Sequence, residues 1–338
     1  MHPAPAIPAR STQQAAARFA CLTLACFILV VLWGAIVRTS GSGAGCGAHW
    51  PLCNGDFFPR HPRLATLIEF IHRSTSGICT LLDLALIAFT FRATLRRHPA
   101  RTAALSSFAF LILEAALGAV LVLRHYVLDN ASNARVLMQS IHFTNTLLLM
   151  ASLALTAWFL TPSRSQPINL PPAQPSNTRW PALLAILSTI LVGATGSLAA
   201  LADTLFPSST LRAAFASDFS ATAPLLVRMR WLHPAAALIA VLCVLPLLRS
   251  ATRLSRVVLT LLLAQFALGV ADILLLAPAW MQILHLLGAD LYWVALVQLA
   301  AQAVWPITSP SATEAPVPHP SQHHALGGTE PPPLMADS

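Results

Sequence analysis

The segment Met138-Gln-Ser-Ile-His142 recurs in the second half of the chain as Met281-Gln-Ile-Leu-His285. Each copy opens a long apolar run that carries almost no other ionisable group. Two further apolar runs open in a related way, at Ile71-His72-Arg73 and at Leu232-His233-Pro234. The chain therefore holds four histidines at the openings of apolar runs, arranged as two pairs, and the repetition indicates two related halves.

The composition is that of a polytopic membrane protein. Of the 338 residues, 56% are hydrophobic and 9% are charged, and the mean hydropathy is +0.68. A soluble core does not need this much apolar surface. The net charge of +8 comes entirely from arginine, because the chain has no lysine. Such a charge indicates membrane topology and gives no support to nucleic-acid binding.

Eight apolar windows are long enough to cross a bilayer, which takes about 20 residues. We expect helices, because a backbone exposed to lipid must satisfy its own hydrogen bonds. The sequence thus predicts an all-α integral membrane protein with eight transmembrane helices. The windows are 18–37, 65–91, 103–123, 136–160, 180–201, 231–248, 257–277 and 282–304.

The short loops predict the orientation in the membrane. One set of loops carries arginine without any acidic residue, and the positive-inside rule places such loops in the cytoplasm. These arginines are Arg92, Arg96, Arg97, Arg101, Arg164, Arg179, Arg249, Arg253 and Arg256. The opposite loops mix charges, so both termini are expected in the cytoplasm. The first apolar window is interpreted as a retained helix, because it is longer than a signal-peptide core and lacks a small-x-small cleavage site.

A second repeated segment supports an internal duplication. Glu114-Ala-Ala-Leu-Gly118 in the third window matches Gln265-Phe-Ala-Leu-Gly269 in the seventh. We therefore expect two pseudo-symmetric four-helix bundles, each able to hold a cofactor between facing helices. The predicted segments are a disordered N-terminus (1–16), the N-terminal half (17–160), a cytoplasmic linker (161–179), the C-terminal half (180–306) and a disordered tail (307–338).

The four histidines are predicted at similar depth. They lie on the second, fourth, sixth and eighth helices, which all run inward, and each falls within roughly the first two turns. A single such histidine can simply bond to another helix. Four at matched depth favour axial ligation of haem iron, His72 with His142 and His233 with His285. Zinc is less favoured, because no cysteine or carboxylate accompanies every pair.

One carboxylate distinguishes the first half from the second. Glu69 precedes His72 by three positions, which places both on one helix face, whereas Arg230 holds the corresponding position before His233. A buried carboxylate beside a haem can relay protons or stabilise positive charge at a reacting carbon. The alternative is a structural partner for Arg73.

Two cysteines lie in the first outer loop. Six residues separate Cys46 from Cys53, on the side of the membrane where oxidation is permitted. The spacing is compatible with a disulfide that fixes the loop and also with a redox-active pair.

Taken together, these motifs resemble the bacterial haem A synthase family, across all eight helices. The motifs are the glycine-rich loop with Trp50-Pro-Leu-Cys53, Ile68-Glu-Phe-Ile-His-Arg73, Asn130-Ala-Ser, Gly193-Ala-Thr-Gly196, Ala202-Asp-Thr-Leu-Phe-Pro207, Leu232-His-Pro234 and Gln282-Ile-Leu-His285. One departure is Asp272, where the family pattern leads us to expect asparagine.

The resemblance implies an enzyme that oxidises the C8 methyl group of haem O to a formyl group by successive hydroxylations, for cytochrome oxidase assembly. It implies haem b as cofactor between His233 and His285, with haem O as substrate between His72 and His142. Glu69 matches the family's glutamate beside the substrate and is the expected catalytic residue.

The resemblance also sets expectations for partners and location. It implies the bacterial inner membrane, with the lipid bilayer around the helices. The predicted topology, with the histidines near the start of helices that run inward, places the haem sites toward the outer face. Haem O synthase and an electron acceptor are the expected partners, and a homo-oligomer is left open. Arg38 and Arg73 are candidate partners for haem propionates, since guanidinium pairs well with carboxylate.

Two other functions fit parts of the pattern. A di-haem b membrane cytochrome in quinol-linked electron transfer also needs two histidine pairs, but such a protein usually places haems near both faces of the membrane. A transporter built from repeats can use histidines in a proton pathway. The sequence shows no obvious broken helix at mid-membrane, which disfavours the transporter.

Overall fold

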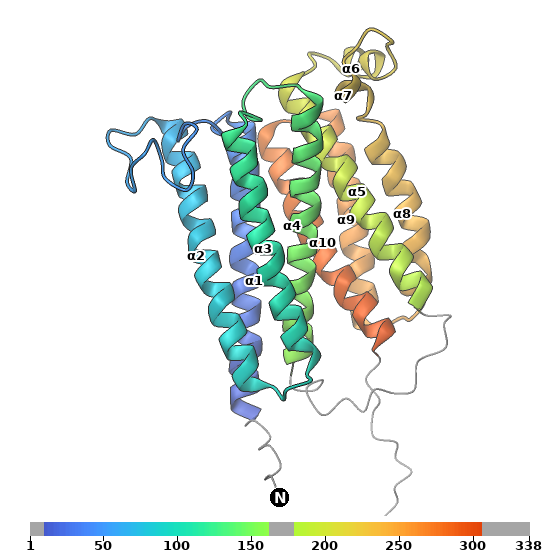
Figure 1. The fold of residues 1–338 in the computed structure, drawn as a ribbon. Coiled ribbons are helices and arrows are strands. Elements are labelled where there is room, and N and C mark those ends of the chain that lie inside the picture. Colours follow the sequence, from blue (N-terminus) through green and yellow to red (C-terminus); the bar gives the residue numbers. More distant parts are fainter. Residues whose placement is uncertain (1–9, 162–178, 306–338) are drawn as a thin grey trace, which may run out of the picture. The chain divides into compact units, whose positions relative to one another are not determined.

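The computed structural model describes residues 10–161 and 179–305. Within these residues the chain forms ten helices and no named strand (Figure 1). They are α1 (Arg10–Thr39), α2 (Leu64–Ala93), α3 (Pro99–Leu123), α4 (Asn133–Leu160), α5 (Arg179–Leu205), α6 (Leu211–Asp218), α7 (Leu225–Arg228), α8 (Leu232–Leu248), α9 (Arg253–Leu274) and α10 (Ala279–Val304).

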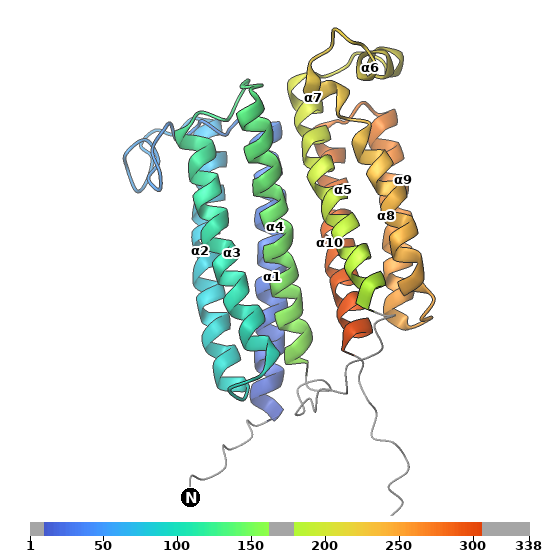
Figure 2. The ribbon, with the colours of Figure 1, turned by 45° about the vertical axis from the view of Figure 1, so that its right-hand side comes forward.

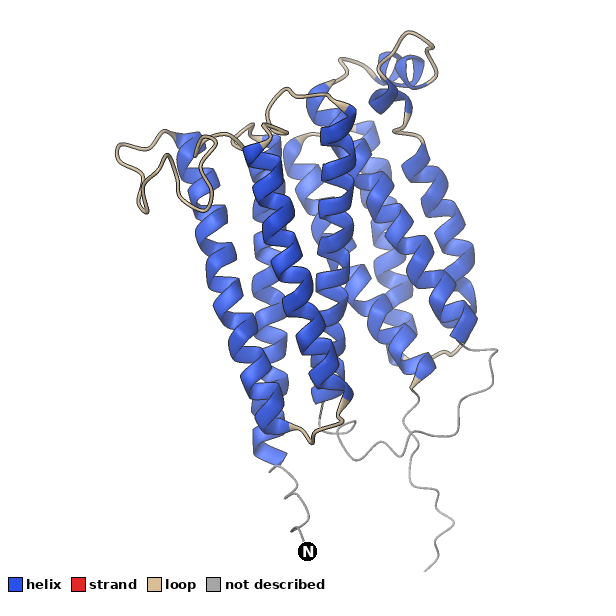
Figure 3. Cartoon of the chain, in the orientation of Figure 1, coloured by secondary structure: helices blue, strands red, loops and turns tan. Residues whose placement is uncertain are grey.

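Among the described residues, eight helical segments are long and apolar enough to cross a membrane, in agreement with the predicted number. The sixth of them, Leu225–Leu248, combines α7 with α8. The loops that follow α1, α3, α5 and α9 lie at one end of the helices (Figure 3). The four helices predicted to carry the paired histidines therefore all begin at that same end. The all-α membrane fold class is confirmed.

Several helix boundaries differ from the sequence prediction, most clearly at α1 and α9. Helix α1 begins at Arg10, so residues 10–16 are helical, although we predicted disorder for them. Helix α9 ends at Leu274, short of the predicted residue 277, because Leu276 and Ala277 adopt positive φ angles of 62° and 51°. The prediction also missed α6 and α7. The rest of the predicted N-terminal segment, nearly all of the linker and the C-terminal tail lie outside the described residues.

Polar side chains begin several helices by accepting hydrogen bonds from free backbone N–H groups. Ser132 accepts from Arg135 N at 3.3 Å before α4, and Thr252 accepts from Ser255 N at 3.1 Å before α9. Before α3, at the same end of the molecule as Thr252, His98 Nδ1 accepts from Ala100 N at 3.2 Å. Burial lowers the pKa of His98, and the neighbouring Arg101 charge lowers it further, so the neutral ring is available as this acceptor.

Helix α4 lies at the centre of the helix packing. It contacts α3 and α1, and it also contacts α5 and α10. The indole Nε1 of Trp293 on α10 donates to Leu147 O on α4 at 2.8 Å, and the Trp293 side chain is almost fully buried. Figure 2 shows α1–α4 on one side of this contact and α5–α10 on the other. Contacts also join the two groups, so the division into two bundles stays a prediction.

Candidate functional site

The histidines of the second half face each other. His233 on α8 and His285 on α10 have ring centroids 6.2 Å apart, with ring planes at 88°. His233 Nδ1 lies 3.0 Å from Val192 O on α5. If Nδ1 carries the proton and donates to this carbonyl, Nε2 keeps a free lone pair for a metal. The buried His285 Nδ1 has no hydrogen-bond partner among the described residues.

The spacing of these two rings fits a metal between them. Two metal–nitrogen bonds of about 2 Å each, plus about 1 Å from each nitrogen to its ring centre, give a centroid separation of about 6 Å. The observed 6.2 Å agrees with this value. The spacing of His233 and His285 is therefore compatible with axial ligation of a haem iron. The reduction potential of such an iron depends on its ligands and their surroundings.

Glycines make room for three of the four histidine rings. A Cβ added at Gly196 on α5 would lie 2.9 Å from His233 Cε1, and one added at Gly269 on α9 would lie 3.3 Å from His285 Cε1. In the first half, a Cβ at Gly34 on α1 would lie 3.2 Å from His72 Cε1. These helices can approach the rings closely only because the glycines lack a side chain.

We expect Gly196→Ala to reduce the haem content of the purified protein, because the new methyl group would displace the His233 ring. The matched control is Gly118→Ala on α3, where an added Cβ meets nothing within 4 Å. Both changes place alanine in a helix interior. The measurement is haem absorbance per mole of protein, and equal haem contents for the two variants would contradict the role given to Gly196.

The histidines of the first half form a less symmetric arrangement. His72 on α2 lies against Gly34, and its buried Nδ1 has no partner within the described part of the chain. His142 Nδ1 on α4 lies 3.0 Å from Glu114 Oε1 on α3. His72 and His142 are close enough to interact electrostatically. His142 lies about 2.5 turns into α4, deeper than predicted, because α4 begins earlier than its apolar window.

Glu69 lies on α2, the helix of His72, and its side chain contacts the first outer loop. Its side chain is buried, and its two oxygens accept hydrogen bonds from Cys46 N at 2.7 Å and from Arg73 Nη2 at 2.5 Å. Arg73 also donates to His49 O and Leu52 O in the same loop. The sequence allowed a second role for Glu69, as a structural partner of Arg73. That ion pair is present, and it spans the helix turn that carries His72.

The loop over this site is closed by the predicted disulfide. Cys46 and Cys53 are bonded and buried. Thr66 Oγ1 on α2 donates to Gly45 O at 2.8 Å, and a Cβ at Gly45 would lie 2.3 Å from Ala65 O. The backbone of the loop is therefore packed directly on the start of α2, beside Glu69.

Arg230 replaces Glu69 in the second half and anchors an outer segment in a comparable way. Its guanidinium pairs with Asp203 at the end of α5, at 2.9 Å, and with Asp218 at the end of α6, at 2.6 Å. The charge is reversed relative to the first half, yet each half uses a partly buried ion pair to hold its outer connection. The sequence comparison identified the exchange of Glu69 for Arg230 but not the aspartates that accompany it.

Arg38 joins the two halves near their outer ends. Its Nη1 donates to Ala200 O at 2.7 Å and to Thr204 Oγ1 on α5. Its Nη2 donates to Gln282 Oε1 at 2.9 Å, one turn before His285. Sequence reasoning missed this link, although the repeated Met-Gln-x-x-His motif contains the glutamine that Arg38 contacts.

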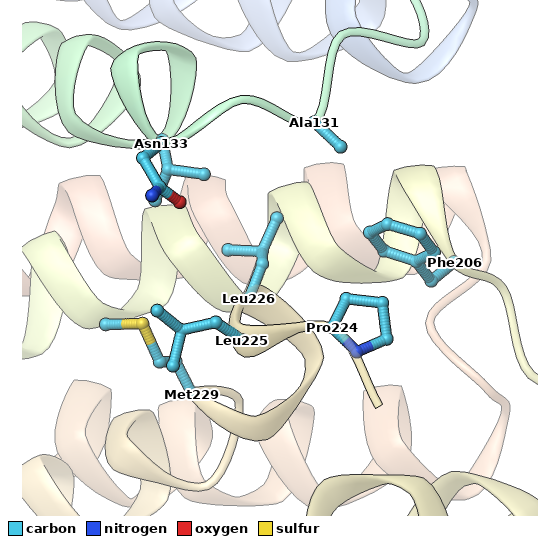
Figure 4. A pocket seen from close by; sticks show the side chains of 8 residues that line it. Ala131, Asn133, Phe206, Pro224, Leu225, Leu226 and Met229 are labelled. Carbon is cyan, nitrogen blue, oxygen red and sulfur yellow. The ribbon is translucent and has the colours of Figure 1, made fainter. Parts of the chain in front are cut away.

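A pocket lies near this outer end and separate from the four histidines (Figure 4). Helix α4, the end of α5 and α7 all contribute to it, so it joins the two halves of the chain. Its lining is mostly apolar, with a single amide side chain. The residues are Ala131, Asn133, Val136, Phe206, Pro224, Leu225, Leu226 and Met229.

Comparison with known proteins gives a family match over most of the chain. The family model COX15-CtaA, described as a cytochrome oxidase assembly protein, matches residues 17–297. A protein from Thermus thermophilus named protoheme IX farnesyltransferase is 41% identical over 289 residues, which cover 82% of this chain and 46% of that protein. Proteins from Bacillus cereus and Bacillus anthracis named heme A synthase are 41% identical over 95 residues, which cover 28% of this chain and 30% of those proteins. The chain thus spans about half the length of the Thermus relative.

Proposed function

Because the chain belongs to the COX15-CtaA family of cytochrome oxidase assembly proteins, we propose that it is a haem A synthase, an oxidoreductase of haem A biosynthesis. Its substrate would be haem O, whose C8 methyl group becomes a formyl group. The observation that carries this proposal is the separation of the His233 and His285 rings, which agrees with a metal between them.

We assign different roles to the two pairs. His233 and His285 would hold haem b as a resident cofactor, and His72 with His142 would hold the haem O substrate. Two features support this division: Glu69 and the disulfide loop lie only beside the first pair. When bound, the haem b would supply an electron-transfer centre.

Glu69 is the proposed catalytic residue, with its carboxylate serving as proton acceptor near the methyl carbon. Each hydroxylation replaces a carbon–hydrogen bond by a bond to a water oxygen and releases two electrons and two protons. The electrons pass to an external acceptor, Glu69 takes one proton, and the other leaves to solvent. The gem-diol then loses water to give the aldehyde. The Arg73 guanidinium lies 2.5 Å from the Glu69 carboxylate. This ion pair fixes the proposed proton acceptor on α2, about one turn before His72.

The proposed setting is a bacterial inner membrane with both termini in the cytoplasm and both haem sites toward the outer face. The arginine-rich loops at the opposite end support this orientation. We also propose a partnership with the enzyme that supplies haem O. The Thermus relative is named for farnesyl transfer to protohaem, and its matched region is only 46% of its length, so we assign the oxidation to the matched region.

Expression of the full chain in a host that makes haem O but no haem A is expected to produce haem A. Extracted haems separated by chromatography and identified by mass provide the measurement. The matched control is the same host carrying the empty vector. A haem O pool left unchanged by well-expressed, haem-containing protein would reject this function and favour a di-haem b cytochrome.

A further inference from the structure

The carboxylate of Glu114 lies beside His142 and has no role in the function proposed above. Glu114 is on α3, and its Oε1 is 3.0 Å from Nδ1 of His142 on α4. Both side chains are mostly buried, with exposed fractions of 18% and 23%. Burying a carboxylate among apolar helices is costly unless its oxygens are paired, so the contact calls for a physical reason.

Two side chains of α4 hold this carboxylate in position. Asn145 Nδ2 donates to Glu114 Oε2 at 2.6 Å, and Thr146 Oγ1 donates to Glu114 Oε1 at 2.5 Å. Asn145 Nδ2 also lies 2.9 Å from Phe110 O, one turn before Glu114 on α3. Asn145 and Thr146, about one turn after His142, therefore fix the Glu114 carboxylate. The carboxylate faces Nδ1 of His142, the ring nitrogen that would point away from a metal bound at Nε2.

The second half lacks this arrangement. Aligning the two Met-Gln-x-x-His copies places Gly288 and Ala289 at the positions of Asn145 and Thr146. Aligning Glu114–Gly118 with Gln265–Gly269, the second repeated segment, places Gln265 at the position of Glu114. The amide of Gln265 donates to His285 O at 3.1 Å. A Cβ at Gly288 would lie 2.3 Å from Gln265 Oε1. All three positions have changed together, so the carboxylate and its donors form one unit that occurs only in the first half.

We propose that Glu114 is a positioning residue for the haem substrate, acting through His142. The 3.0 Å approach of His142 Nδ1 lets the carboxylate accept a hydrogen bond from Nδ1–H once Nε2 binds the iron, and this bond would fix the tautomer and the direction of Nε2. A carboxylate behind a metal-bound histidine also makes the imidazole a more basic ligand. The first haem site therefore favours ferric iron more strongly than the second, where no carboxylate of the described residues pairs with His285 Nδ1. This inference rests on the proposed function, because it takes His142 as an iron ligand.

The expected effect can be given as a ratio. Loss of an outer partner of a metal ligand typically changes metal affinity by about 10- to 100-fold. A tenfold loss of the preference for ferric over ferrous haem raises the midpoint potential of a one-electron couple by about 59 mV. Glu114→Gln, which keeps the side-chain volume and removes the charge, should raise the potential of the first haem by at least this amount and leave the second haem unchanged.

The test is a redox titration of the purified full-length protein carrying haem b and haem O, followed by absorbance. Asp83→Asn is the matched control, because Asp83 is a buried carboxyl of the same half that accepts a hydrogen bond from Ser107 Oγ at 2.9 Å. The control should shift neither haem. The low-spin ferric resonance signal of the first haem is a second readout, expected to move in Glu114→Gln only.

A second variant gives a shift of opposite sign. Thr146→Val removes a competing donor from Glu114 Oε1, so the hydrogen bond from His142 strengthens and the potential of the first haem should fall. A purely structural role for Glu114 would move both variants in the same direction. Should Glu114→Gln fail to fold, a rise or no change in Thr146→Val would overturn the proposal by itself.

The outcomes separate this inference from the proposed function. Wild-type protein that makes haem A, with the Glu114→Gln midpoint unchanged, rejects the role of Glu114 and leaves the enzyme assignment standing. Wild-type protein that binds no haem rejects both.

Discussion

His233→Ala and His285→Ala are each expected to abolish haem b binding in protein purified from a host that makes no haem O. Loss of an outer partner of a metal ligand already costs about 10- to 100-fold in affinity, and a direct ligand should cost at least as much. The ring centroids are 6.2 Å apart, which is the separation expected for two ligands of one metal. In the proposed site, removing either ring would leave the iron without one of its two histidine ligands.

In the same host, His72→Ala and His142→Ala should leave the haem b content unchanged, because their site awaits a substrate that the host does not make. His49→Ala, in the exposed part of the first outer loop, is the control for removal of a histidine as such. Absorbance of the reduced protein, divided by protein concentration, is the measurement. Equal loss from all four variants would contradict the division into cofactor and substrate sites and would support a di-haem cytochrome.

The number of membrane helices was predictable from sequence because lipid leaves the backbone few alternatives. The helix ends were harder to predict. Arg10 begins α1 in a polar stretch that hydropathy does not mark, and α9 stops at Leu274 although apolar residues continue. The end of α9 depends on backbone angles at Leu276 and Ala277, which an apolar pattern does not reveal.

The site was predictable where the signal lay within one helix or in the repeats. The paired histidines stood out because ionisable groups are rare in apolar runs. The contact between Glu69 and Arg73 followed from their spacing of four residues on one helix. In both cases the sequence itself contained the relation that the structure displays.

Contacts between helices were not predictable, since they depend on how each helix is rotated against its neighbour. Glu114 meets His142 across α3 and α4, and Arg38 meets Gln282 across α1 and α10. A signal for Glu114 did exist, because the matched segment of the second half has Gln265 instead. A position-by-position comparison of the two halves singles out Glu114 as a difference. It does not reveal the 3.0 Å distance to His142 or the hydrogen bonds from Asn145 and Thr146.

Glu69→Gln is expected to slow haem A formation by about 100-fold or more, because general acid–base groups typically contribute 10²- to 10⁴-fold. Haem O should still bind to this variant, since His72 and His142 remain. The variant protein is thus expected to retain the absorbance of both haems while the formyl product disappears. Measuring substrate haem and product haem in the same purified sample separates a loss of chemistry from a loss of binding.

The ion pair with Arg73 provides the matched control for Glu69. Arg73→Gln breaks the same 2.5 Å contact from the other side but leaves the carboxylate, which still accepts from Cys46 N at 2.7 Å. If Glu69 accepts the proton, haem A formation should fall much less in Arg73→Gln than in Glu69→Gln. If Glu69 only anchors the loop, the two variants should lose activity and thermal stability to the same extent. Equal losses would therefore assign Glu69 to structure and require another proton acceptor beside His72.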